Sequence, residues 1–91
     1  MINETYKPLL KPFVFPNGIQ LKNRVVMAPM TNYSSNSDGT VSDEEINYYI
    51  HRSKGVSMVI TACTYVTPNG QGFPGEFAGH TDEMIPSLRR L

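Results

Sequence analysis

The chain has 91 residues, and its eight lysines and arginines balance eight aspartates and glutamates, which leaves a formal net charge of zero. Nucleic acids and anionic membranes are bound through clustered positive charge, so this composition predicts neither partner. The single cysteine, Cys63, excludes an intrachain disulfide, and no apolar segment reaches the ~20 residues of a membrane span, which together favour a cytoplasmic protein.

The N-terminal region is predicted to be an extended arm followed by a hairpin. Pro8 and Pro12 interrupt any continuous helix over residues 1–12, because proline lacks the amide hydrogen that a helix interior needs. Residues 13–21 contain two short β-forming runs around the tripeptide Pro-Asn-Gly at 16–18. The Asn-Gly step supplies the positive φ that a tight turn requires, so we expect a β-hairpin here.

A strand and a long loop follow the hairpin. Residues 25–28 form a continuous apolar run, which is typical of a strand buried on both faces. Pro29 is predicted to end this strand, because it cannot donate a hydrogen bond to a neighbouring strand. Residues 31–41 are polar, and a loop of that length in a compact domain is more often functional than idle.

The next predicted element is a helix over residues 42–55. Ser42 can cap the first turn while Glu45, three residues later, bonds back to the Ser42 backbone, as in a capping box. Apolar residues at helical spacing predict one buried stripe, formed by Ile46, Tyr49 and Ile50. Gly55 is predicted to end the helix.

The C-terminal third is predicted to hold a second buried strand, a loop and the start of a helix. Residues 56–66 are rich in β-branched side chains and are predicted to be the strand. Residues 67–80 contain four glycines and two prolines, which predicts no regular element there. Pro86 suits the first position of a helix whose apolar face begins with Leu88 and Leu91.

The order of these elements predicts an α/β fold with parallel strands. The strands begin near residues 25 and 57, about one βαβ unit of ~30 residues apart, and such units make right-handed crossovers. Two strands and one complete helix cannot cover both faces of a parallel sheet, so we expect residues 1–91 to be a truncated part of one larger domain. Ligands bind at the carboxyl ends of parallel strands, which points to the loops at 28–36 and 62–80.

Neither a phosphate-binding glycine motif nor metal-ligand spacing is present, since His51 and His80 lie far apart with only one cysteine. Three blocks nevertheless resemble the start of the Old Yellow Enzyme family, also called NADH:flavin oxidoreductases: LKNRVVMAPMTNYSS, SDEEINYYIHRSKG and MVITACTYVTPNGQG. The resemblance runs over residues 12–91. It implies a (β/α)8 TIM barrel, of which residues 1–91 would be the N-terminal hairpin and the first two βα units.

The resemblance also implies which residues meet the cofactor. The strand end that would lie against the FMN ring comprises Ala28, Pro29 and Met30. Thr31 would donate a hydrogen bond near a flavin carbonyl and so tune the reduction potential. Tyr33 would face the substrate pocket, and Cys63 would lie beside the flavin at the end of the second strand. Thr31 and Tyr33 are therefore the candidate catalytic residues.

Each assignment has a structural alternative. Thr31 could be a loop residue that bonds to local backbone, and Tyr33 could cover core surface with its hydroxyl in water. Cys63 is expected to be a small, buried side chain that packs inertly. Arg24 is expected to have a structural role, and Tyr49 is expected to pack on one face of its helix.

The predicted function is that of an FMN-dependent oxidoreductase. It would transfer hydride from NADH or NADPH through FMN to an electrophilic alkene such as an enone. Two alternatives stay open: the N-terminus of an iron–sulfur enzyme similar to 2,4-dienoyl-CoA reductase, and a non-catalytic fragment that acts by association. Assembly into a homo-oligomer is compatible with all three.

Overall fold

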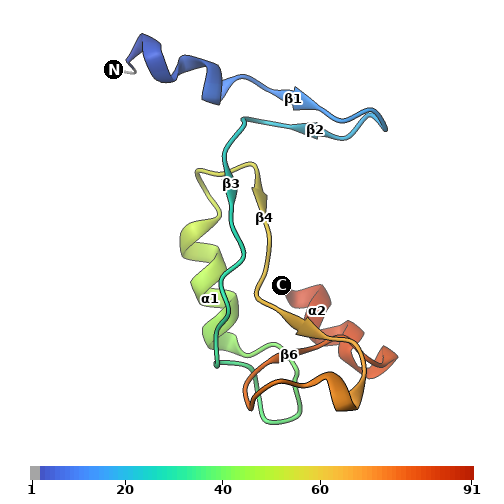
Figure 1. Ribbon diagram of the computed structural model, residues 1–91. Coiled ribbons are helices and arrows are strands. Elements are labelled where there is room, and N and C mark those ends of the chain that lie inside the picture. Colours follow the sequence, from blue (N-terminus) through green and yellow to red (C-terminus); the bar gives the residue numbers. More distant parts are fainter. Residues whose placement is uncertain (1–2) are drawn as a thin grey trace.

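The computed structural model describes residues 3–91 (Figure 1). Within them the helical elements are η1 (Glu4–Leu10), α1 (Asp43–Arg52), η2 (Pro68–Gly70), η3 (Asp82–Met84) and α2 (Ile85–Arg90), where η marks a 3-10 helix. The strands are β1 (Phe13–Val14), β2 (Gln20–Leu21), β3 (Val26–Met27), β4 (Met58–Val59), β5 (Thr64–Tyr65) and β6 (Phe77–Ala78). They form three separate pairs, antiparallel β1–β2 and parallel β3–β4 and β5–β6.

The prediction of an extended arm was wrong for the described part of residues 1–12. Residues 4–10 form η1, and Asn3 caps it by accepting a hydrogen bond from the Thr5 N–H at 2.9 Å. Pro8 lies inside this helix. A 3-10 helix tolerates it because the φ of proline, fixed near about −65°, is already helical and only one amide donor is given up. Residues 1 and 2 lie outside the described residues.

The predicted hairpin is confirmed. β1 and β2 pair antiparallel, with Phe13 opposite Leu21. Gly18 has a φ of +92°, so the glycine of the Asn-Gly step is the left-handed residue of the turn. Asn17 Oδ1 accepts a hydrogen bond from the Ile19 N–H at 3.1 Å, which helps to close the turn. The hairpin lies beyond the N-terminal ends of β3 and β4 (Figure 1).

β3, α1 and β4 form one parallel βαβ unit, as predicted. Met27 pairs with Val59, and α1 runs alongside the two strands in the opposite direction (Figure 1). Val25 and Val26 are 37% and 38% exposed, so the burial predicted for both faces of β3 is not reached within residues 3–91, where α1 lies on one side. The largest buried apolar cluster consists of Val41, Tyr49, Ala62 and Phe77.

Helix α1 begins as predicted but ends earlier. Ser42 Oγ accepts a hydrogen bond from the Glu45 N–H at 3.2 Å, and the Glu45 carboxylate accepts one from the Ser42 N–H at 3.0 Å. The capping box is therefore complete. The helix ends at Arg52, and Gly55 has no positive φ, so Gly55 is not a left-handed cap. Ile50, the last residue of the predicted stripe, is exposed.

The single strand predicted over residues 56–66 is two strands. β4 pairs with β3, whereas β5 pairs with β6, with Thr64 opposite Phe77. β6 and the short 3-10 helix η2 lie within residues 67–80, where no regular element was predicted. That prediction failed because Phe77 and Ala78 are 2% and 1% exposed, and the burial of this apolar pair outweighs the glycines and prolines around it.

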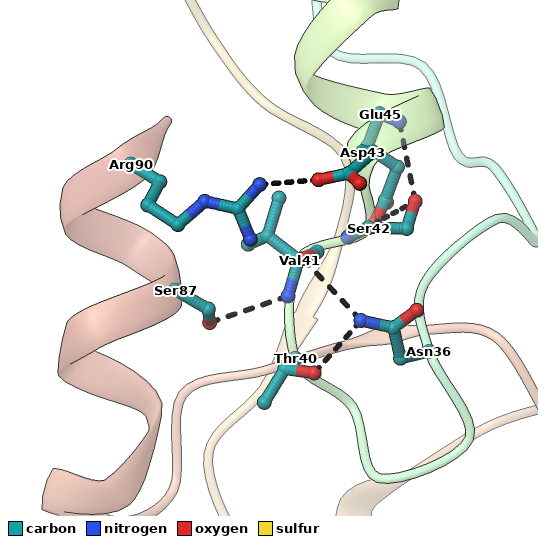
Figure 2. A network of polar contacts seen from close by, with 8 residues as sticks. All are labelled: Asn36, Thr40, Val41, Ser42, Asp43, Glu45, Ser87 and Arg90. Carbon is teal, nitrogen blue, oxygen red and sulfur yellow. Dashed lines mark hydrogen bonds and ion pairs between the residues drawn. The ribbon is translucent and has the colours of Figure 1, made fainter.

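Helix α2 packs against the N-terminal end of α1 (Figure 2). The Val41 N–H donates to Ser87 Oγ at 3.2 Å, and Arg90 forms an ion pair with Asp43. Pro86 lies in the first turn, as predicted. The buried residue of α2 is Ser87, however, and the predicted apolar face is exposed at Leu88 and Leu91.

Polar bonds tie the corner between β2 and β3 to the segment that follows α1. Lys22 Nζ donates to the Lys54 carbonyl oxygen at 2.7 Å, and Asn23 Nδ2 donates to that of Gly55 at 3.0 Å. Asn23 is buried, and its Oδ1 also accepts a hydrogen bond from the Val25 N–H at 2.9 Å. These bonds hold the N-terminal ends of β3 and β4 together and leave the opposite ends to the long loops.

Candidate functional site

The C-terminal ends of β3 and β4 bring Thr31 and Cys63 together. Each lies four residues beyond its member of the Met27–Val59 pair, so the parallel register carries both to the same edge. Thr31 Oγ1 donates a hydrogen bond to Cys63 Sγ at 3.5 Å. Both residues are exposed. The edge therefore presents a hydroxyl and a thiol side by side.

The backbone that leads to Thr31 carries N–H groups that have no partner among the described residues. Ala28, Pro29 and Met30 are exposed, and within residues 3–91 the N–H groups of Ala28 and Met30 form no hydrogen bond. Proline has no N–H, which agrees with the end of strand pairing before Pro29. Free amides beside a hydroxyl suit a flat ring with carbonyl oxygens. The donor set thus fits the flavin that the sequence predicted.

The two loops that the sequence indicated as ligand loops contact each other. The rings of Tyr33 and Phe73 meet edge to face with their centroids 4.7 Å apart. The Ser35 N–H donates to the Gly75 carbonyl oxygen at 3.1 Å. Tyr33 is 72% exposed, so within residues 3–91 it covers no core surface. Its ring is therefore open to solvent on one side and contacts Phe73 of the loop at 62–80 on the other.

A cavity of about 400 Å³ opens between the first loop and α1, lined by Met30, Thr31, Asn32, Ser34, Glu44, Glu45 and Tyr48. Glu45 is 1% exposed, and its carboxylate accepts hydrogen bonds from Ser35 Oγ at 2.9 Å and from the Ser42 N–H at 3.0 Å. These bonds satisfy the buried carboxylate. Glu45 therefore ties the first loop to the helix, a role that its place in the capping box signalled only in part.

Behind the edge, Tyr49 supports the segment that leads to Cys63. Its hydroxyl accepts a hydrogen bond from the Ala62 N–H at 2.9 Å, and both residues are buried. Burial raises the pKa of Tyr49 above its ordinary value of 10.0, so the phenol stays neutral. The sequence predicted only packing for Tyr49, because helical spacing gives no signal of a hydrogen bond to the segment between β4 and β5.

Two other sequence expectations are settled by burial and contacts. Cys63 is exposed within residues 3–91, so the prediction that it is buried was wrong, because Ala62 takes the buried position beside it and neighbouring residues of an extended chain face opposite ways. Arg24 lies over the Phe13 ring, 5.6 Å from its centroid, and donates to the Pro12 carbonyl oxygen at 3.4 Å, which is the expected structural role.

The part of the chain that the structure describes has neither a cluster of metal-ligating side chains nor a helix that could cross a membrane. No group of three His, Cys, Asp or Glu side chains is placed there so that it could hold a metal ion. No helix in residues 3–91 has the length and apolar character to cross a membrane.

Comparison with protein families matches residues 8–91 to the NADH:flavin oxidoreductase / NADH oxidase family. Among curated proteins, the chain is 53% identical over 90 residues to the probable NADH-dependent flavin oxidoreductase YqiG of Bacillus subtilis (strain 168). That match covers 99% of this chain and 24% of the relative. The chain therefore spans about a quarter of the length of this relative.

Solved structures agree with the predicted fold. The old yellow enzyme from Trypanosoma cruzi matches with a TM-score of 0.79 and 30% identity, over 94% of this chain and 23% of that one. A 2-naphthoyl-CoA reductase in complex with 2-naphthoyl-CoA matches with a TM-score of 0.85 and 29% identity, over 93% of this chain and 13% of that one. The prediction of the hairpin and first two βα units of a (β/α)8 barrel is confirmed.

Proposed function

The chain belongs to the NADH:flavin oxidoreductase / NADH oxidase family, and from this premise we propose that the intact protein is an FMN-dependent oxidoreductase. It takes reducing equivalents from NADH or NADPH and reduces an activated C=C bond in a small molecule such as an enone. Residues 1–91 are the N-terminal portion of its single FMN-binding barrel domain. We propose a cytoplasmic location, which is compatible with nicotinamide donors because they are intracellular reductants.

The observation that carries this proposal is the shared edge of β3 and β4. The Thr31 hydroxyl, the Cys63 thiol and the amides of Ala28 and Met30, which have no partner within residues 3–91, lie where two parallel strands end. In α/β barrels ligands bind at this end of the strands. Hydrogen-bond donors that are already in place stabilise negative charge without reorganisation, which is what the ring of a flavin requires when it is reduced.

Each residue of the edge has a distinct role in the proposed reaction. When bound, FMN supplies the hydride transfer that amino-acid side chains cannot perform. The backbone of residues 28–30 holds the ring, and the Thr31 hydroxyl donates a hydrogen bond where negative charge develops. Tyr33, braced by Phe73 at 4.7 Å between ring centroids, forms one wall of the pocket that orients the acceptor.

The likeness to 2-naphthoyl-CoA reductase favours a second candidate, a reductase of CoA thioesters. That reductase matches this chain with a TM-score of 0.85 and 29% identity, over 13% of that larger protein. The two candidates use the same flavin edge and differ in the acceptor, since an unsaturated thioester also carries an activated C=C bond. Whether the protein reduces an enone or an unsaturated thioester therefore distinguishes the two candidates.

The test is the visible absorbance spectrum of the purified intact protein before and after anaerobic addition of NADH or NADPH. Flavin bands that bleach and then recover when a cyclic enone is added support the proposed function. Recovery with an unsaturated acyl-CoA and not with the enone moves the assignment to the second candidate. A protein that takes up no FMN on reconstitution contradicts both and supports the non-catalytic alternative.

A further inference from the structure

The contact between Thr31 and Cys63 joins two residues that lie 32 positions apart in the chain. It is fixed by the pairing of β3 with β4, since each residue stands four positions beyond the Met27–Val59 pair. Ala62, directly before Cys63, is buried and bonded to the Tyr49 hydroxyl at 2.9 Å. The β3–β4 register and the buried Ala62 together therefore keep the Cys63 thiol next to the Thr31 hydroxyl.

The hydroxyl of Thr31 has one hydrogen to donate. In the structure it donates to Cys63 Sγ, with 3.5 Å between oxygen and sulfur. A threonine hydroxyl has two acceptor lone pairs but only this one donor, and a thiol sulfur is a weak acceptor. A ligand carbonyl at the same edge therefore competes with Cys63 for the hydrogen of Thr31. The outcome of that competition decides how strongly Thr31 donates to the ligand.

We propose that Cys63 is a positioning residue for the flavin, which acts through Thr31 by competing for its hydroxyl hydrogen. This inference rests on the proposed function, because it needs the flavin at the β3–β4 edge. Since sulfur accepts weakly, the hydroxyl is oriented toward the edge by Cys63 and still yields its hydrogen to a ring carbonyl oxygen. Cys63 thus moderates the effect of Thr31 on the reduction potential and does not itself need to touch the reacting atoms.

The experiment is a double-mutant cycle on the midpoint potential of the bound flavin, measured in the intact protein by equilibration with a reference dye. The variants are Cys63→Ala and Cys63→Ser, each made with Thr31 and with Thr31→Ala. Cys63→Ala removes the competing acceptor, so the potential is expected to become more positive. Cys63→Ser introduces oxygen, a stronger acceptor than sulfur, so the potential is expected to become more negative. In the Thr31→Ala background both shifts should vanish.

The cycle distinguishes this inference from the proposed function. Opposite shifts that depend on Thr31 support the inference, because a side chain that only fills space would act equally in both backgrounds. If the Cys63 substitutions shift the potential equally with Thr31 and with Thr31→Ala, the role of Cys63 is overturned and the proposed function stands. The same holds if Thr31→Ala changes the potential but the Cys63 substitutions do not. A wild-type protein that binds no FMN overturns both. The ratio of bound FMN to protein in each variant shows that the site has folded.

Discussion

The hydroxyl of Tyr49 accepts a hydrogen bond from the backbone N–H of Ala62 at 2.9 Å, and this bond links α1 to the segment between β4 and Cys63. Ala62 is 5% exposed and Tyr49 is 6% exposed, so water cannot take the place of either partner. The position of the thiol at the proposed flavin edge therefore depends on a side chain of the helix behind it.

Tyr49→Phe is expected to destabilise the intact protein by about 1–3 kcal/mol, the cost of leaving a buried donor without a partner. Urea unfolding of the wild type and the variant measures the free-energy difference. Tyr48→Phe is the matched control, because Tyr48 is only half-buried and its ring is engaged by Arg52, whose guanidinium lies 4.0 Å from the ring centroid. Equal losses in the two variants would contradict the importance of the Tyr49–Ala62 bond.

Tyr49 is also expected to make stability depend on alkaline pH. Burial raises its pKa above 10.0, so the folded protein holds the phenolic proton more tightly than the unfolded chain does. The resulting stabilisation is fully present below pH about 10, the unfolded pKa, and is lost as the pH rises through the folded pKa. The free energy of unfolding should fall more steeply above pH about 10 in the wild type than in Tyr49→Phe. Parallel curves would show that Tyr49 does not contribute.

Gly39→Ala is expected to disrupt the contact between the loop at residues 31–41 and β6. Gly39 has a φ of +86°, and an added Cβ would lie 2.4 Å from the Ala78 Cβ and 2.6 Å from the Tyr65 hydroxyl oxygen. Gly18→Ala is the control, because Gly18 has a similar φ of +92° with nothing within 4 Å. Backbone strain of about 1–2 kcal/mol is common to both, and overpacking adds about 1–3 kcal/mol in Gly39→Ala alone. Equal stabilities of the two variants in urea would refute the steric argument.

Much of the fold could be predicted because local signals determine it. The Asn-Gly step fixes the hairpin, and the capping box formed by Ser42 and Glu45 fixes the start of α1. β6 could not be predicted, because it exists through the burial of Phe77 beside β5 and through the Ala78 N–H, which donates to the Gly39 carbonyl oxygen at 2.9 Å. Such long-range contacts leave no pattern in the segment itself.

The candidate site likewise has parts that the sequence could predict and parts that depend on long-range contacts. The loops at 28–36 and 62–80 could be assigned to one edge from the order of strands, because parallel strands end on the same side. The family resemblance, and not the strand order, placed Thr31 and Cys63 at that edge. Their mutual contact depends on the register of β3 with β4, which the sequence does not state. The pairing of Tyr33 with Phe73 likewise depends on the path of two loops, and the sequence indicated the loops but not the pair.

Tyr33 is expected to act through its ring in the binding of the acceptor. Tyr33→Ala removes the edge-to-face pair with Phe73 and one wall of the proposed pocket. An aromatic contact contributes about 0.5–1.5 kcal/mol, so KM for a cyclic enone should rise about 2- to 10-fold. Tyr33→Phe keeps the ring and should stay near the wild-type KM, with the FMN content unchanged in both variants. An unchanged KM in Tyr33→Ala would exclude Tyr33 from the pocket.

Thr31→Ala is expected to lower the midpoint potential of the bound FMN and to slow its reduction by NADH or NADPH. The reduced ring carries more negative charge than the oxidised ring, so the loss of a donor destabilises the reduced state more. A hydrogen bond is worth about 1.5–3 kcal/mol to a charged acceptor and about 0.5–1.5 kcal/mol to a neutral one, and the difference of about 1–1.5 kcal/mol corresponds to a loss of roughly 5- to 10-fold in the equilibrium between reduced and oxidised flavin. Anaerobic stopped-flow reduction and dye equilibration measure the rate and the potential separately. Thr31→Ser keeps the hydroxyl and should therefore retain most of the wild-type rate and potential. If Thr31→Ala leaves the potential unchanged while FMN still binds, Thr31 is a loop residue bonded to Cys63 and has no part in the chemistry.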